Sequence, residues 1–389
     1  MRPSYFDPIR ERLVRALERF LQEKSKELSR VNPMGAEAVR RLLEFSVRGK
    51  MIRGCLVHVG WALARKTPPG GDRATAGARG TGGARGTGGA QRPAAEDAAV
   101  TAAGAAMELF QSGLLVHDDI MDRDPVRRGL PAIFRQYEEE SARAGNADPA
   151  HVGQALGICA GDVAYFMAFE LLSCGLIPAP AAGRVLRLCA RELSAVGIAQ
   201  MQDVAWGASD RPVDSEQVLK MYTYKTGRYS FSLPLLTGAA LADGTDAPAE
   251  GADGLAAGLE ACGESLGVLF QLRDDELGIF GTEEQTGKPL ASDLREGKKT
   301  LLVSLLMEES SAAERRRLQD ILGNPGCTPD DLDFVRGLAG AAPVRQRMRS
   351  LVAGLTARAE EAIRALPTGA EEDRAALRSL LDFTTARSQ

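Results

Sequence analysis

The stretch LFQSGLLVHDDIMD, residues 109–122, is the part of this chain that says most about its fold and its chemistry. A helix-forming apolar run ends in three aspartates, Asp118, Asp119 and Asp122. Residues i and i+4 lie on the same side of a helix, so Asp118 and Asp122 offer their carboxylates in one direction. Carboxylates crowded on an apolar helix repel one another and are costly to desolvate unless a cation lies between them. On its own, such a motif more often marks a solvated helix face than a cation site.

A second acidic cluster, Asp274-Asp275-Glu276, follows another apolar run, LGVLFQLR, at residues 266–273. Acidic clusters on helices are usually solvated surfaces, but two clusters in the same apolar setting favour a metal site. Oxygen ligands of this kind suit Mg²⁺, and also Mn²⁺. Because Mg²⁺ usually keeps waters and is completed by phosphate oxygens, two such clusters facing each other predict a Mg²⁺–diphosphate site.

The composition excludes several classes of protein. Of 389 residues, 44% are apolar and 26% charged, which is ordinary for a soluble globular protein, and a net charge of −4 argues against a nucleic-acid partner. The six cysteines form no CxxC pair and only three histidines occur, so a zinc site or a disulfide framework is not expected. The N-terminal 20 residues predict an amphipathic helix rather than a signal peptide. The best apolar run, residues 98–117, contains Glu108, so we expect a cytoplasmic chain without a membrane span.

Helical patterns dominate the rest of the chain. Leu13, Leu17 and Leu21 mark one face of the first helix, and enrichment in Ala, Leu, Glu and Arg continues to the C-terminus. No strand pattern of useful length is evident. Chains of this kind form bundles whose ligand sites lie between facing helices. We therefore predict an all-α, single-domain antiparallel helical bundle around a central apolar cavity.

Residues 67–95 differ from the rest. The hexamer ARGTGG occurs twice in tandem, at 78–83 and 84–89, and the segment lacks bulky apolar residues. A phosphate-binding loop would need a preceding strand and a closing GK[ST], which are absent from this sequence. We predict a flexible Gly-rich insert within one domain that spans residues 1–389.

Several further motifs occur in a fixed order with the two acidic clusters. They are Gly49-Lys50-Met51-Ile52-Arg53, Arg127-Arg128-Gly129, Gly161-Asp162, Gln200-Met201-Gln202-Asp203, Lys225-Thr226-Gly227, Phe270-Gln271, Thr286-Gly287-Lys288 and DLREGKKT at 293–300. Over residues 35–305 this series resembles the trans-isoprenyl diphosphate synthases, the polyprenyl synthetase family, and most of all the bacterial geranylgeranyl and farnesyl diphosphate synthases. The resemblance implies the isoprenoid synthase fold, a homodimer, and condensation of isopentenyl diphosphate with an allylic diphosphate.

The same resemblance assigns the metal ligands. Asp118 and Asp122 are implied to bind two Mg²⁺ ions and Asp274 a third, with Asp119 and Asp275 supporting them. Mg²⁺ stabilises negative charge on a departing diphosphate and orients it. The implied catalytic set is Asp118, Asp122, Asp274, Lys225 and Arg127.

Two substrate pockets are implied as well. For the allylic diphosphate the implied residues are Arg127, Lys225, Thr226, Gln271 and Lys288. For isopentenyl diphosphate, which binds without metal, they are Lys50, Arg53, Gln111 and Arg128. Arg grips phosphate oxygens bidentately, whereas Lys acts as a point charge. Taken singly, these basic residues read as helix decoration or as a helix C-cap, and only the ordered set favours phosphate binding.

Product length is set by the room along the helix before Asp118. The family's controlling positions are Gly113 and Leu114, and Phe110 lies one turn deeper as a floor. Gly113 leaves open space where farnesyl-making enzymes often have an aromatic residue. Each isoprene unit adds about 5 Å, close to one helical turn, so we predict a geranylgeranyl product, with farnesyl or longer-chain products as alternatives.

One departure from the family pattern concerns the second acidic cluster, in which Gly278 replaces the usual third aspartate. Two other functions compete with prenyl elongation: a class I terpene cyclase and a non-catalytic subunit of a hetero-oligomeric synthase. Aromatic residues make up only 5% of the chain, and the block containing Lys50 and Arg53 is present, which speaks against a cyclase. The intact charged motifs speak against a non-catalytic subunit.

Overall fold

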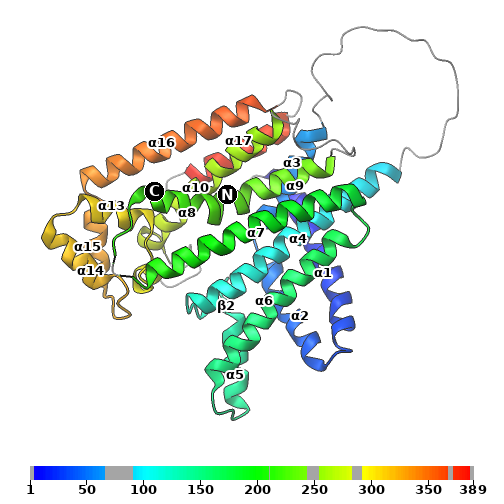
Figure 1. Ribbon diagram of the computed structural model, residues 1–389, viewed down its shortest axis with the longest axis horizontal. Helices are drawn as coiled ribbons and strands as arrows, with labels where there is room; N and C mark the ends of the chain where they lie inside the picture. The colour runs from blue at the N-terminus through cyan, green and yellow to red at the C-terminus, as the bar shows by residue number, and fades with distance from the viewer. Residues whose placement is uncertain are drawn as a thin grey trace, which may run out of the picture.

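The computed structural model describes residues 4–65, 91–209, 211–242, 254–282, 291–366 and 371–385. Helices dominate these ranges (Figure 1). The strands found within them are β1 (Val126–Arg127) and β2 (Leu130–Pro131), a short antiparallel pair with Val126 opposite Pro131. The all-α prediction is confirmed, while the assignment of the whole chain to one domain stays a prediction.

The helices have the following bounds in chain order. They are η1 (Ser4–Phe6), α1 (Asp7–Leu28), α2 (Pro33–Val47), α3 (Ile52–Arg65), α4 (Gln91–Met121), α5 (Ile133–Arg143), α6 (Pro149–Ser173), α7 (Ala179–Gly207), α8 (Ser215–Tyr222), η2 (Thr223–Ser232), α9 (Leu233–Ala242), α10 (Leu255–Phe280), α12 (Ser292–Arg295), α13 (Leu301–Glu309), α14 (Ala312–Ile321), α15 (Pro329–Ala339), α16 (Ala342–Ala365) and α17 (Glu371–Thr385). Local sequence starts several of them. Asn32 and Asp148 cap α2 and α6, each followed by a proline in the first turn.

Helix α4 is the central element of the bundle. It contacts α1, α3 and α6, and α6 in turn contacts α7 (Figure 1). Two helical segments, 95–121 of α4 and 149–173 of α6, are long and apolar enough to cross a membrane; the apolar window is 83% buried in α4 but only 44% buried in α6. The core position of α4 explains its apolar character, whereas α6 leaves part of its apolar surface uncovered.

Helices α8, η2 and α9 follow one another without a break from Ser215 to Ala242. The middle part, η2, is a π-helix of 10 residues, a wider turn that is rare and often occurs at functional sites. It packs so closely against α10 that a Cβ on Gly267 of α10 would overlap the Cα of Gly227 of η2. Glycine at both positions allows the two backbones to approach, and this contact fixes η2 against α10.

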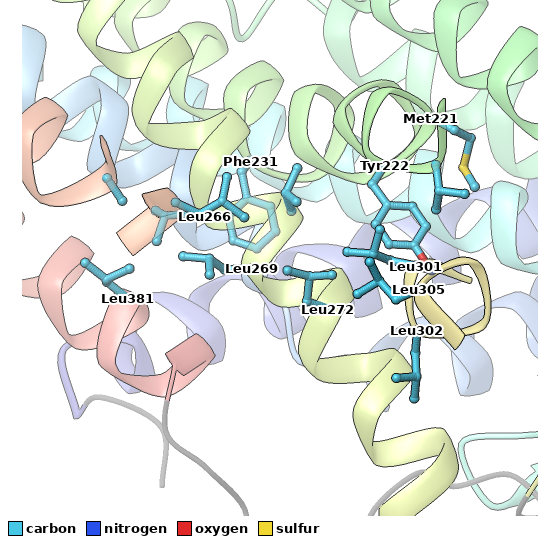
Figure 2. Close-up of a cluster of buried hydrophobic side chains, with 14 of the residues drawn as sticks. Met221, Tyr222, Phe231, Leu266, Leu269, Leu272, Leu301, Leu302, Leu305 and Leu381 are labelled. Carbon is cyan, nitrogen blue, oxygen red and sulfur yellow. The ribbon is translucent and has the colours of Figure 1, made fainter. Parts of the chain in front are cut away.

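Two apolar clusters stabilise the bundle. One joins residues of α1 to α4, α6 and α7, and in it Leu13, Leu17 and Leu21 are fully buried, as their spacing predicts. The other surrounds α10 and brings in η2, α13 and α17, as Phe231, Leu269 and Leu381 illustrate (Figure 2). The helix of the first acidic motif, α4, is therefore packed in one cluster, and the helix of the second, α10, in the other.

The predicted boundary of the Gly-rich insert needs a correction. Residues 91–95 belong to α4, whose helix begins at Gln91, because the Ala-rich sequence that follows favours helix. The other residues of the predicted insert, apart from these, lie outside the described ranges, and so does Lys288.

Candidate active site

A cavity of about 340 Å³ opens between α4, α7, η2, α10 and the segment 292–300, which is large enough for a small ligand. Its charged and amide lining residues are Arg53, Gln111, Asp118, Arg127, Gln200, Asp203, Lys225, Gln271, Asp274, Asp275, Asp293, Lys298 and Lys299. Its apolar lining includes Leu114, Leu115, Val196, Met221 and Phe270. The structure thus brings most of the sequence-predicted residues into one cavity that is polar at one part and apolar at another.

The first acidic motif spans the last turn of α4 and Asp122, the residue directly after it. The Oδ1 atom of Asp118 accepts a hydrogen bond from Gln200 Nε2 at 2.9 Å. Asp122 lies one turn later, and its Oδ2 atom is 2.6 Å from Lys298 Nζ. Burial, and next the neighbouring Asp118, raise the pKa of Asp122 above its ordinary value. Proximity to Asp118 thus makes ionisation of Asp122 costly, and a cation placed between the two carboxylates would remove that cost.

Arg127 organises the acids of this motif. Its guanidinium lies 2.5 Å from Asp119, 3.0 Å from Asp124 and 3.7 Å from Asp118. Burial lowers the pKa of Arg127, but these carboxylates outweigh it and raise the pKa above its ordinary value. Asp119 is 1% exposed, so it faces Arg127 in the interior while Asp118 lines the cavity. This geometry suits a supporting role for Asp119.

Two ammonium groups reach the cavity from other elements. Lys225 of η2 lies 2.5 Å from Asp203 of α7, and Lys298 is within 2.9 Å of Glu296 as well as bound to Asp122. Burial lowers the pKa of Lys225, yet the carboxylates of Asp118 and Asp203 raise it overall. Both ammonium groups are therefore charged at neutral pH and are held at the cavity wall by neighbouring carboxylates.

The second acidic motif lies on α10, where adjacent residues point about 100° apart. Asp274 is exposed to the cavity, whereas Asp275 is 6% exposed. Asp275 accepts hydrogen bonds from Tyr222 Oη and, at 2.9 Å, from Gln271 Nε2. Burial raises the pKa of Asp275 to about 8. Like Asp119, the second residue of its motif supports the site from the interior.

Gly278, which replaces the usual third aspartate of the second motif, lies close to the carboxylate of another residue, Asp293. A Cβ built on Gly278 would lie 3.2 Å from Oδ2 of Asp293, which is on α12. A side chain at position 278 would therefore project toward a carboxylate that already lines the cavity. The acidic surface on this side is continued by Asp293.

Basic residues of the second predicted pocket lie beside η2 and α2. Arg53 donates a hydrogen bond to Ser230 Oγ at 2.5 Å and stacks over the Tyr229 ring, 5.0 Å from its centroid. Arg128 donates to the carbonyl oxygen of Phe45 at 2.6 Å. Burial lowers the pKa of Arg128 to about 10, so it remains charged at neutral pH.

Four non-glycine residues in the described ranges have positive φ, namely Met51, Arg123, Arg128 and Ala291, with φ between 54° and 60°. Met51 lies between Lys50 and Arg53, Arg123 follows the first acidic motif, and Ala291 precedes the segment that ends in Lys298. Such a conformation costs about 1–2 kcal/mol per residue and tends to occur at functional sites. In the described ranges, the non-glycine residues with positive φ lie in or beside the predicted motifs, which supports the placement of the active site at this cavity.

The prediction of open space at Gly113 is wrong. A Cβ at Gly113 would lie 2.7 Å from Cε1 of Tyr165 and 2.9 Å from the carbonyl oxygen of Gly161, both on α6. The position is closed by helix packing and offers no open space. Phe110 is also fully buried and packs edge-on against Phe169 of α6, with ring centroids 5.0 Å apart. Of the three predicted product-length residues, Leu114 is the one that lines the cavity.

We expect Gly113→Phe to destabilise the protein by about 3 kcal/mol or more, because the new ring must force α4 and α6 apart. Thermal unfolding followed by circular dichroism measures the change. Leu114→Phe is the matched control, since its side chain has the cavity to enter. A Gly113→Phe protein with an unchanged melting temperature would show that α6 yields more easily than its packing indicates.

Comparisons with known proteins agree with this geometry. The model of the family described as "Polyprenyl synthetase" matches residues 37–336. This chain belongs to the polyprenyl synthetase family. The geranylgeranyl diphosphate synthase of Sulfolobus acidocaldarius is 33% identical over 59% of this chain, and the match spans 63% of that relative, less than two thirds of its length. The same-named enzyme of Saccharolobus solfataricus is 30% identical over 73% of this chain and 79% of its own.

Solved structures of the family also match. A geranylgeranyl pyrophosphate synthase from Corynebacterium glutamicum, complexed with isoprenyl diphosphate and magnesium, superposes with a TM-score of 0.82 at 26% identity, covering 98% of this chain and 99% of that chain. Other relatives are named as farnesyl and geranylfarnesyl diphosphate synthases. The predicted family and the isoprenoid synthase fold are confirmed, and the relatives named above are diphosphate synthases, as the predicted enzyme class requires.

Some residues of the site are not identified by the sequence patterns. In the sequence, Lys298 is seen only as part of the DLREGKKT motif, although it binds Asp122. Tyr222 belongs to no predicted motif, although its hydroxyl donates a hydrogen bond to Asp275. Asp203, ambiguous in the sequence, pairs with Lys225. No sequence pattern marks a buried tyrosine as part of a site. Lys298 could be identified from the GKK sequence that precedes α13.

Proposed function

We propose that the chain condenses isopentenyl diphosphate with an allylic diphosphate and that its main product is geranylgeranyl diphosphate. The observation that supports this most is the single cavity lined by Asp118 of the first motif, Asp274 of the second and the ammonium groups of Lys225 and Lys298. A cavity that carboxylates and ammonium groups line together suits a polyanion bound through cations. We place the reaction in the cytoplasm.

The residues present fit a divalent cation. Within the described ranges no group of three or more His, Cys, Asp or Glu side chains is gathered as a ready metal site, but Lys298 lies against Asp122 where a cation is needed to offset burial and repulsion. Asp118, Asp122 and Asp274 supply hard oxygen donors for Mg²⁺, and three ions per site are proposed, with Mn²⁺ as a substitute. When bound, Mg²⁺ neutralises charge on the leaving diphosphate.

The protein's own residues bind and orient the allylic substrate. Lys225 and Arg127 donate charge-assisted hydrogen bonds at the point where the breaking C–O bond leaves negative charge. Thr226 donates to Gln271 Oε1 at 2.8 Å, which holds the Gln271 amide beside the cavity. Leu114, Leu115 and Val196 line the apolar part, where the prenyl tail is excluded from water.

Isopentenyl diphosphate is proposed to bind at Arg53, Arg128 and Lys50, with Gln111 at the cavity wall. Ser230 and Tyr229 hold Arg53, and Phe45 holds Arg128, so the two guanidinium groups are positioned before a substrate arrives. The alkene then attacks the allylic carbocation. We assign the final proton transfer to the departed diphosphate, consistent with a chain of only three histidines.

An assay of the purified protein with labelled isopentenyl diphosphate and each of three allylic starters, analysed by chromatography, tests the function. Elongation to a C20 chain supports the proposal, and a C15 or longer main product supports an alternative product length. Cyclised hydrocarbon would indicate a terpene cyclase. Complete inactivity that a second subunit restores would indicate a non-catalytic partner, and either of these last two results overturns the proposal.

A homodimer is proposed for this chain, and exposed apolar side chains support it. Phe166 on α6 is 70% exposed, and Ile198 and Met201 on α7 are 67% and 68% exposed. These helices are in contact with each other, and α6 has apolar surface that the chain itself leaves uncovered. Exposed apolar patches of this kind commonly mark protein interfaces.

We expect Phe166→Asp to shift the protein from dimer to monomer in sedimentation velocity, because a carboxylate at the centre of an apolar interface is costly to desolvate. Val31→Asp is the control, since Val31 is 78% exposed at the turn between α1 and α2. A monomeric wild-type protein, or a dimer that tolerates Phe166→Asp, would contradict the placement of the interface.

A further inference from the structure

Tyr222, the last residue of α8, is a buried tyrosine whose hydroxyl has no part in the reaction described above. The residue is 4% exposed, and its ring packs among apolar side chains that include Met221, Leu301 and Leu305 (Figure 2). Its hydroxyl donates a hydrogen bond to Oδ2 of Asp275 and accepts one from the backbone N–H of Leu301 at 3.0 Å. A tyrosine hydroxyl has one proton to donate, so donor and acceptor are both used.

One partner of Tyr222 belongs to the second acidic motif. Asp275 follows the proposed ligand Asp274 on α10, and its other oxygen accepts from Gln271 Nε2 at 2.9 Å. Gln271 is joined through its amide oxygen to Thr226 of η2. The hydroxyl of Tyr222 and the amide of Gln271 therefore fix both oxygens of Asp275, and with them the turn of α10 that presents Asp274.

The other partner starts the helix that follows the Lys298–Thr300 segment. Leu301 is the first residue of α13, and Thr300 caps this helix by accepting from the N–H of Val303 at 3.3 Å. The N–H of Leu301, in the first turn, has no acceptor within the helix, and Tyr222 supplies one. Three residues earlier, Lys298 binds Asp122 of the first motif. The bond from Tyr222 thus anchors the segment that reaches across to α4.

We propose that Tyr222 is a positioning residue for prenyl transfer, which holds the second acidic motif and the Lys298-bearing segment in one arrangement around the allylic diphosphate. It acts through Asp275 and Leu301 rather than on the reacting atoms. The proposal rests on the proposed function of the same cavity. It predicts that the hydroxyl matters for Mg²⁺ and diphosphate binding more than the ring does.

The test uses Tyr222→Phe, which keeps the ring and removes both hydrogen bonds. Titration calorimetry with Mg²⁺ and inorganic pyrophosphate is expected to show binding about 10-fold weaker or more, as for other residues that orient metal ligands. In steady state, KM for the allylic diphosphate and the Mg²⁺ requirement should rise, while KM for isopentenyl diphosphate stays within about twofold of wild type. Tyr137→Phe is the control, because Tyr137 is a buried tyrosine on α5, stacked under Arg41 and outside the cavity lining.

A double-mutant cycle separates positioning from a general loss of stability. Asp275→Asn, Tyr222→Phe and the double variant are compared by the same calorimetry, and the double variant should lose clearly less affinity than the sum of the two single losses, because both single variants remove the Tyr222–Asp275 bond. Additive losses, or wild-type pyrophosphate binding by a folded Tyr222→Phe protein, overturn the proposal. Calorimetry does not depend on turnover. A wild-type protein that binds Mg²⁺–pyrophosphate but makes no product would therefore refute the proposed function. The role of Tyr222 in Mg²⁺–pyrophosphate binding would still be decided by the calorimetry of its variants.

Discussion

Asp118→Ala is expected to lower kcat/KM by about 1,000-fold or more, a larger effect than we expect from any other single substitution in the cavity. Loss of about 4 kcal/mol of transition-state stabilisation corresponds to this factor, and removal of an electrostatic group at the reacting centre has effects of that size. The variant should remain folded, because Asp118 is near the cavity surface and its removal also relieves repulsion with Asp122. Turnover of labelled isopentenyl diphosphate over a range of Mg²⁺ concentrations measures the effect.

The matched control for this variant is Asp97→Ala on the same helix. Asp97 forms an ion pair with Arg12 at 3.1 Å, and its side chain is 43% exposed, far along α4 from the acidic motif. Its removal should leave turnover and the Mg²⁺ requirement unchanged. If Asp118→Ala kept its activity with a normal Mg²⁺ dependence, the metal assignment would be ruled out.

Lys225→Met should lower kcat/KM for the allylic diphosphate by about 100-fold and leave KM for isopentenyl diphosphate nearly unchanged. The variant loses a charged donor where negative charge accumulates on the leaving group. It also leaves Asp203, which is 8% exposed, without its ammonium partner, which costs about 1–3 kcal/mol of folding stability. Kinetics with each substrate varied in turn, together with thermal unfolding, separate the two effects.

Lys220→Met provides the comparison, because Lys220 is an exposed lysine on α8. It should match wild type in both measurements. Equal losses for the two substrates in Lys225→Met would contradict the assignment of Lys225 to the allylic pocket.

Much of this fold follows from helical periodicity. The spacing of Leu13, Leu17 and Leu21 places them correctly in the core, and the apolar runs before both acidic clusters place Asp118 and Asp274 on buried helices that face one cavity. The different surroundings of Asp274 and Asp275 also follow from helix geometry, since adjacent residues point in different directions. These features depend on residues that are close in sequence.

The features that the sequence predicts wrongly or does not reveal are contacts between segments far apart in the chain. The sequence predicts open space at Gly113, but Tyr165, which blocks it, belongs to a different helix, and a single sequence does not reveal which face of α4 meets α6. The bond between Lys298 and Asp122 likewise joins segments far apart in the chain. Tyr222 reads as an ordinary core aromatic, and nothing in its neighbourhood along the sequence indicates the two partners of its hydroxyl.

The π-helical stretch Thr223–Ser232 limits how this protein can evolve. It carries Lys225, which we propose for the allylic diphosphate, and, further along, Ser230, which holds Arg53, proposed for isopentenyl diphosphate. Loss of one residue between them would rotate everything downstream about the helix axis, so Ser230 would no longer face its arginine. Surface loops can gain or lose residues at little cost, but here the distance along the chain sets the spacing between the two proposed substrate pockets. We therefore expect homologous sequences to keep the length of this stretch even where its side chains vary.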